Sequence, residues 1–150
     1  MRARQNDHAP CAGTGVFPVD GESRVNQLDM LELAARAAGW EAKRHTVRDC
    51  IAIHVRPHAA AAWRAFDSIG SRADAFELSS AARIDVTHFA DYVTAHAGAG
   101  AFRHFTHDDI DAQHDVGAQQ VERERATRRA ITECAALIGR DVGAPWWRTV

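Results

Sequence analysis

Histidines and aspartates are concentrated between residues 104 and 115, and this segment has the highest density of groups that could do chemistry. It contains His104, His107 and His114, three of the nine histidines of the chain. Imidazoles and carboxylates that converge can bind Zn²⁺ or Mn²⁺ and activate a water molecule. Their spacing matches no metal motif, and side chains three residues apart on a strand point to opposite faces. We therefore expect a solvated loop without metal or cofactor, and we keep a metal-dependent hydrolase or nuclease as the alternative.

A second candidate site combines the indole of Trp63 with the carboxylates of Asp67 and Asp74. An aromatic plane beside carboxylates can hold a base, a sugar or the edge of a peptide. The alternative is that the tryptophan packs in the core while the aspartates cap a loop and a helix. Arg128 and Arg129 form a basic pair that is available to a partner. We interpret these residues as the candidate binding residues and ask whether they converge on one cleft.

The sequence contains no glycine-rich nucleotide-binding motif and no nucleophile elbow. The backbone arrangements that bind phosphates or present a nucleophilic serine are therefore not indicated. We therefore lean toward a non-enzymatic protein. The cysteines Cys11, Cys50 and Cys134 are odd in number and widely spaced, which argues against a disulfide framework or a zinc knuckle. Cys50 and Cys134 lie in apolar runs and are predicted to be small buried residues. This cysteine usage fits a reducing cytoplasm best.

The formal net charge is only -2, and 46% of the residues are hydrophobic. A near-neutral total argues against a dedicated nucleic-acid binder, which normally shows a basic face, although a local patch is compatible with it. No apolar run approaches the roughly 20 residues of a membrane span. The N-terminal segment lacks the apolar region of a secretory signal. We expect no membrane partner and a cytoplasmic protein.

A length of 150 residues predicts one domain. Residues 1–22 are rich in Gly, Pro, Asn and Asp without any period, which predicts a flexible arm. The arm precedes a single α+β domain over residues 23–150. Apolar residues at helical spacing predict a first helix over residues 26–38, with Asn26 as its N-cap and Ser23 as a competing start.

Strand patterns occur in two places. β-branched residues that alternate with period two predict a hairpin with strands over residues 41–47 and 51–56. The pattern of residues 59–66 is compatible with either a helix or a third strand. A second hairpin is predicted from residues 84–94 and 101–106.

Two more helices are predicted, over residues 72–82 with Ser71 as N-cap and over residues 119–138. Gly39 and Gly139 are placed as helix C-terminal stops. The inward residues of the second helix are predicted to be Ala75, Phe76, Leu78 and Ala82. Those of the last helix are predicted to be Val121, Ala130 or Ile131, Cys134, Leu137 and Ile138. The order helix, hairpin, helix, hairpin, helix predicts an α+β fold with a mainly antiparallel sheet and helices packed on one face.

A series of segments resembles small uncharacterised proteins of tailed bacteriophages and prophages, the NinX-like group. The segments occur in the family's order and are Leu31–Gly39, Trp63 before an aspartate-containing loop, Asp74–Leu78, Ile84–Val86, Ala126–Ile131 and Ile138–Arg140. The family's usual Trp-Asn-Pro is absent, because Arg64, Ala65 and Phe66 follow the tryptophan.

The resemblance covers about residues 28–140 and brings no reaction with it. It implies a phage or prophage accessory protein that acts in the bacterial cytoplasm, where such proteins often modulate host proteins, including defence systems. Our leading interpretation is a non-enzymatic binder of a host protein or a small ligand. A third interpretation, binding of nucleic acid through the Arg-rich last helix, is disfavoured by the glutamates interleaved there.

Overall fold

The computed structural model describes residues 16–18, 22–89, 92–98, 101–106 and 116–141. Within these ranges the chain alternates helices with short antiparallel strands. In chain order the elements are β1 (Val16–Pro18), α1 (Glu22–Ala37), β2 (Glu41–Val47), β3 (Cys50–Arg56), β4 (Arg64–Phe66), α2 (Arg72–Ala82), β5 (Asp85–His88), β6 (Tyr92–Ala97), β7 (Ala101–Thr106) and α3 (Val116–Asp141). No helix in the described part of the chain is long and apolar enough to cross a membrane.

The strands form two separate antiparallel sheets. In the first sheet β3 lies between β2 and β1, and β4 pairs with β3 on the same edge as β1. The second sheet has the order β5-β6-β7. The predicted α+β class with antiparallel strands is confirmed. Two sheets, however, replace the single sheet that we expected to carry all helices on one face.

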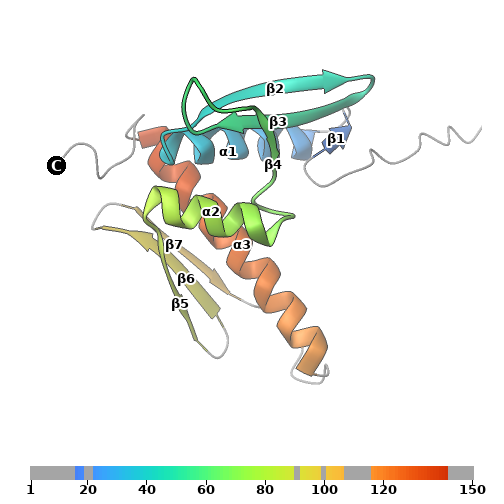
Figure 1. Ribbon diagram of the computed structural model, residues 1–150. Coiled ribbons are helices and arrows are strands. Elements are labelled where there is room, and N and C mark those ends of the chain that lie inside the picture. Colours follow the sequence, from blue (N-terminus) through green and yellow to red (C-terminus); the bar gives the residue numbers. More distant parts are fainter. Residues whose placement is uncertain (1–15, 19–21, 90–91, 99–100, 107–115, 142–150) are drawn as a thin grey trace, which may run out of the picture.

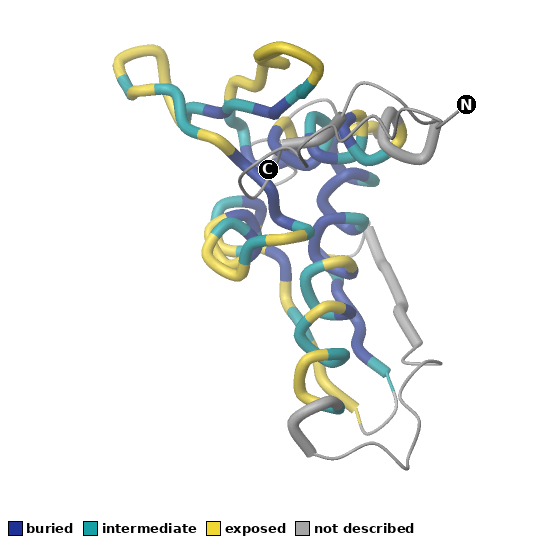
Figure 2. Tube along the Cα trace, turned by 90° about the vertical axis from the view of Figure 1, so that its right-hand side faces the viewer, coloured by how far each residue is buried: buried dark blue, intermediate teal, exposed yellow. Residues whose placement is uncertain are grey.

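The helices lie as a layer between the two sheets (Figure 1). The β2–β3 hairpin covers α1 on one side, and β6 and β7 pack against α3 on the other. Inward side chains of both sheets, among them Ile53, Val55 and Val93, are almost completely buried. Figure 2 shows buried chain through the middle of the molecule and exposed chain at the hairpin and at the start of α3.

Gly139 allows α3 to approach α1 closely. A Cβ atom at this position would lie 1.9 Å from the carbonyl oxygen of Leu33. The prediction that Gly139 stops the helix is therefore wrong, since α3 continues to Asp141. Gly139 is required because no side chain fits between the two helices at this position. It does not have the positive φ with which a glycine commonly ends a helix.

The end of α1 is as predicted, but its beginning is not. Gly39 has a φ of 77°, and the N–H of Trp40 donates to the carbonyl of Ala35 at 3.0 Å, which closes the helix. The helix already begins at Glu22, so Asn26 lies within it and is not its cap. The arm predicted over residues 1–22 also includes β1, which pairs with β3.

The first hairpin is confirmed, with its turn at Arg48, whose φ is 55°. Residues 59–66 do not form a helix, and the strand β4 covers only Arg64–Phe66, after Trp63, while turns and bends precede it. The predicted strand over residues 84–94 is divided into β5 and β6, so the second sheet is a three-stranded meander. α2 has the predicted bounds, and Ser71 caps it by accepting the N–H of Asp74 at 3.3 Å.

Cys134 is a buried free thiol, as predicted, and burial raises its pKa to about 11. A thiol with so high a pKa is a poor nucleophile at neutral pH. Cys50 is disulfide-bonded and only partly buried, so the prediction of a small buried residue is wrong there. Disulfides are more typical of oxidising compartments than of the reducing cytoplasm that the cysteine count indicated.

A buried hydrogen bond joins the β4–α2 loop to α3. The hydroxyl oxygens of Ser68 and Thr132 are 2.7 Å apart, and both residues are fully buried. Thr132 donates its own proton to the carbonyl of Arg128 at 2.8 Å. The hydroxyl of Ser68 is therefore the donor to Thr132, and both polar groups are satisfied inside the core.

We expect Gly139→Ala to destabilise the protein by about 3 kcal/mol, because the new methyl group can only be accommodated if the two helices move apart. Helix propensity alone predicts the opposite sign, a gain of about 1 kcal/mol. Urea denaturation followed by circular dichroism measures the difference. An unchanged or increased free energy of unfolding would show that α1 and α3 do not approach each other at this residue.

Candidate functional site

Asp67 and Asp74 lie together at the loop between β4 and α2. Asp67 is buried, with 6% of its surface exposed. Its carboxylate accepts the N–H groups of Ile69 at 3.2 Å and Gly70 at 3.0 Å. The N–H of Asp67 donates to Asp74 Oδ2 at 2.8 Å. These bonds close a turn and satisfy backbone donors, so the carboxylate of Asp67 acts as a loop cap.

Asp74 and Arg128 complete this capping cluster. Asp74 Oδ1 accepts a hydrogen bond from Arg64 at 2.8 Å, and Arg64 also pairs with Glu77. Arg128 Nε donates to the carbonyl oxygen of Ile69 at 2.8 Å, which ties the loop to α3. Three of the predicted binding residues, Asp67, Asp74 and Arg128, thus converge, and their hydrogen bonds stabilise the fold.

The other two predicted residues lie elsewhere. Arg129 forms an i,i+4 ion pair with Glu133 on α3 at 3.5 Å. Trp63 lies beside the β2–β3 hairpin, where Lys43 Nζ is 4.2 Å and Arg56 Cζ 4.6 Å from the centroid of its ring. The predicted residues are therefore divided among the capping cluster, the surface of α3 and the hairpin.

The residues of the metal-site alternative cannot be compared with the fold in the same way. His107 and His114 lie outside the described residues, as does the side chain of His104 in β7. Among the residues that the structure describes, no group of three or more His, Cys, Asp or Glu side chains is placed to hold a metal ion.

An open cleft of about 520 Å³ lies between α2, β5 and α3, and we call it the α2–α3 cleft. It is lined by Arg72, Ala75, Phe76, Ser79, Ile84, Asp85, Val86, His88, Gln120, Arg123, Glu124, Thr127, Arg128 and Ile131. Apolar side chains and charged groups of both signs contribute to its walls. Its volume falls within the range of ligand sites, which is about 300–1,000 Å³.

An ion pair spans the cleft from α2 to α3. Arg72 Nε donates to Glu124 Oε2 at 2.8 Å, and a second nitrogen of the guanidinium contacts both carboxylate oxygens. This hydrogen bonding, supported by Gln120, lowers the pKa of Glu124. The carboxylate is thus held as an anion. Arg123 donates to the carbonyl of Phe89 at 2.8 Å, on the β5 side of the cleft.

Among the described residues, three large hydrophobic side chains are exposed in this half of the molecule, and one of them, Phe76, lines the cleft. Phe76 lines it and is 72% exposed, and Val121 on α3 is 54% exposed. Phe89, stacked on Tyr92 with ring centroids 4.3 Å apart, is 41% exposed. The predictions that Phe76 and Val121 face the core are therefore wrong.

The exposure of Phe76 could have been predicted from the helical period of α2. Ala75, Leu78 and Ala82 form its buried stripe, and Phe76 lies about 100° further round the helix than Ala75. The period of α3 also indicates the exposure of Val121, which lies nine residues before the buried Ala130 and therefore about 180° round the helix from it. Figure 2 shows exposed chain in the early turns of α3.

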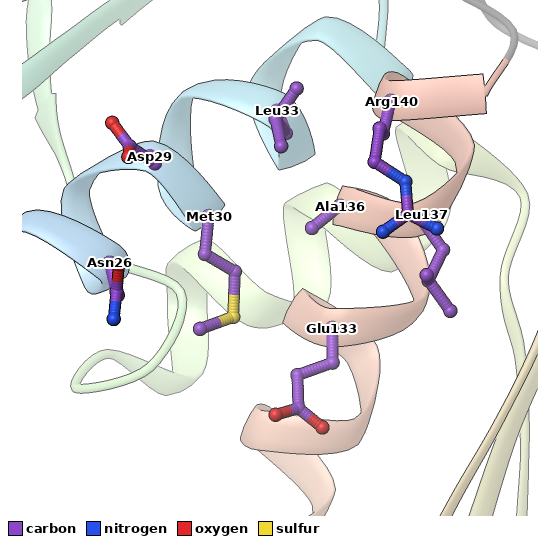
Figure 3. A pocket seen from close by; sticks show the side chains of 8 residues that line it. All are labelled: Asn26, Asp29, Met30, Leu33, Glu133, Ala136, Leu137 and Arg140. Carbon is purple, nitrogen blue, oxygen red and sulfur yellow. The ribbon is translucent and has the colours of Figure 1, made fainter. Parts of the chain in front are cut away.

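A smaller groove of about 260 Å³ lies between α1 and α3 (Figure 3). Met30 and Leu33 of α1 and Leu137 of α3 provide its apolar walls, with Asp29 and Glu133 at its borders. Asp29 is already paired with an arginine of β2. The volume is below the usual range of ligand sites, so the α2–α3 cleft is the stronger candidate.

We expect Asp67→Ala to cost about 1–3 kcal/mol, because the N–H groups that Asp67 accepts would lose their partner at a buried position. Asp67→Asn keeps an oxygen acceptor and should cost less. Thermal and urea unfolding measure both. If Asp67 were instead a contact residue, both variants would keep the stability of the wild type and lose a ligand.

The protein should lose stability on acidification through His54. Burial, followed by the charges of His45 and Lys43, lowers the pKa of His54 in the folded chain. The unfolded chain therefore binds this proton more readily, so the contribution is complete above the unfolded pKa of about 6.5 and declines as the pH falls through the folded pKa. His54→Gln should flatten the decline in melting temperature between about pH 7.5 and pH 5.5. His58→Gln is the control, and equal slopes for wild type and His54→Gln would contradict the expectation.

None of the protein-family models, curated proteins or solved structures with which the chain was compared matches it. The candidate site therefore depends on the geometry of the described residues alone. The likeness to phage proteins depends on the sequence segments that carry it. The three comparisons therefore indicate no ligand, reaction or partner.

Proposed function

We propose that this chain is a non-enzymatic accessory protein of a tailed phage or prophage, which binds a host protein. The phage setting is supported by the resemblance of about residues 28–140 to the NinX-like proteins. The binding site in this proposal is the α2–α3 cleft, and its occupant is a segment of the host protein. Counter-defence, in which binding inactivates a host defence system, is the outcome that the setting favours by association.

The observation that carries the proposal is the exposed aromatic ring of Phe76 at the border of the cleft. Exposed hydrophobic residues are unremarkable when they are scattered, but clusters of them mark interaction sites. Here Phe76 combines its exposure with a position in the wall of the cleft, and the carbonyl of the exposed Phe89 accepts a hydrogen bond from Arg123 of the same wall. A rigid aromatic side chain beside a concave surface is the usual form of a binding hot spot.

The charges around the cleft favour an acidic segment with an apolar anchor. Three arginines line it, Arg72, Arg123 and Arg128, against the carboxylates of Asp85 and Glu124. The excess of positive charge would attract acidic residues on the partner. An apolar partner side chain could fill the cleft beside Phe76.

Binding is favoured over catalysis because the charged groups that α3 contributes to the cleft are already engaged. Glu124 is held by Arg72, and Arg128 and Arg123 each donate to a backbone carbonyl. A general acid or base needs a pKa near the working pH. The pKa of Glu124 is shifted in the opposite direction, downward.

The test is quantitative capture of host proteins by purified, immobilised protein. We expect Phe76→Ser to weaken capture of a specific partner by at least about 30-fold, the effect of a hot spot worth roughly 2 kcal/mol. Serine and phenylalanine have similar helix propensity, and the side chain is exposed, so the variant should fold normally. Val47→Ser also removes an exposed hydrophobic side chain, at the far end of the hairpin, and is the control.

Supporting results are a partner lost with Phe76→Ser and retained with Val47→Ser, together with a directly measured affinity for the purified pair. The same proteins captured by wild type and Phe76→Ser would remove the cleft from the proposal. Stabilisation of the wild type by a protein-free host extract, with no protein partner, would indicate a small ligand and overturn the host-protein occupant.

A further inference from the structure

The outer face of the β2–β3 hairpin carries cations and aromatic rings. Antiparallel register places Lys43 opposite His54 and Glu41 opposite Arg56, so these side chains share one face. The intervening residues of β3 turn inward, where they are buried. We call the outer set the hairpin face, and it consists of Glu41, Lys43, His45, His54, Arg56 and Trp63.

Positive charge on the hairpin face exceeds negative charge. Its only carboxylate, that of Glu41, is paired with Arg56. Lys43 is the single lysine of the chain and forms no ion pair with any described residue. Arg44, which turns to the other side of β2, is neutralised by two carboxylates of α1. The imbalance is therefore confined to the outer face.

The histidines add to this accumulation of like charges. The rings of His45 and His54 lie 4.8 Å apart between centroids, with 32° between their planes. Charges on His45 and Lys43 contribute, after burial, to the lowered pKa of His54. The cations and imidazoles thus repel one another, and a bound anion would relieve the repulsion.

Trp63 holds the fixed cations in position. Lys43 Nζ lies 4.2 Å and Arg56 Cζ 4.6 Å from the ring centroid, within the range of cation–π contacts. Arg56 also donates to the carbonyl of Ala59 at 3.0 Å. A cation–π contact orients a cation without neutralising it, so the charge of Lys43 can still act on a ligand, whereas Arg56 is also paired with Glu41 and offers its remaining N–H groups.

The spacing of these groups fits a chain of anions better than a single one. Lys43 and His45 lie two positions apart on β2, and His54 and Arg56 lie two positions apart on β3. This spacing corresponds to about 7 Å along each strand. Rings alternate with the cations, and flat rings can stack on bases. β2 is exposed along its whole length and lies at the edge of its sheet, so a strand could cross the face without obstruction.

We propose that the hairpin face binds single-stranded nucleic acid, with Lys43 and Arg56 against phosphates and the rings against bases. The near-neutral total charge argues against a footprint over the whole chain, and the hairpin face is a local patch that suits a few nucleotides. It belongs to the sheet above α1, whereas the α2–α3 cleft lies between α2, β5 and α3 (Figure 1). This inference is therefore independent of the proposed host partner.

The test is fluorescence anisotropy of a labelled oligothymidine of about 15 nucleotides, titrated with the full chain at several salt concentrations. Two phosphate contacts predict a slope of about -1.4 for log K against log salt. Lys43→Gln should weaken binding roughly fivefold at low salt and reduce the slope by about 0.7. Lys43→Arg should restore both. Arg36→Gln makes the same charge change at an exposed position of α1 and should leave binding unchanged.

A loss with Lys43→Gln at unchanged melting temperature, and none with Arg36→Gln, supports the proposal. Absence of salt-sensitive binding, or equal losses in the two variants, overturns it. Polyglutamate that competes as well as unlabelled oligothymidine would assign the face to an acidic polypeptide instead. Duplex DNA bound as tightly as the single strand, or displacement by equimolar inorganic phosphate, would also contradict the proposed occupant.

Discussion

Where α1 meets α3, backbone lies against backbone, because Gly139 leaves no side chain between the helices and the carbonyl of Leu33 occupies that space. The surrounding contact is made largely by small residues, and Ala34, Ala35 and Ala135 are fully buried. Helices that pack through alanine and glycine gain dispersion from main-chain contact, and bury little side-chain area of their own. The larger buried side chains come from several elements, with Leu28 and Leu31 from α1, Leu78 from α2, and Ile53, Val55 and Val93 from the two sheets.

This arrangement leaves two chemically different surfaces. The β2–β3 hairpin contributes its apolar face to the core, so its charged residues collect on the outer face. On the other side, α3 is longer than the layer it belongs to, and its early turns border α2 and β5 instead of a packed neighbour. The cleft with its exposed hydrophobic residues follows from that overhang. The hairpin face and the α2–α3 cleft thus lie on different sides of the helix layer.

Local signals were sufficient for most elements. The cap at Ser71 fixed the start of α2, and period-two alternation located the strands of the first hairpin. Tertiary roles were harder to predict. A glycine near a helix end fits both a C-terminal stop and a close contact, and only the position of α1 decides the case of Gly139. The proximity of Asp67 to Trp63 in the sequence led to its prediction as a binding residue. Its role in capping the loop depends on hydrogen bonds that only the folded geometry shows. The cations beside the tryptophan come from strands distant in sequence, so no local pattern contains them.

The hydrogen bond between Ser68 and Thr132 has a consequence for the rotational setting of α3. A helix surface made mainly of alanines has little relief, so turning it about its axis changes its packing only modestly. A turn by one residue, about 100°, would leave the hydroxyl of Ser68 without its partner in an apolar interior, which is costly, whereas Thr132 would keep its bond to Arg128 within the helix. One polar contact thus selects a single angular position for the longest helix. Because α3 forms a wall of the cleft, the same contact determines which of its side chains meet a partner.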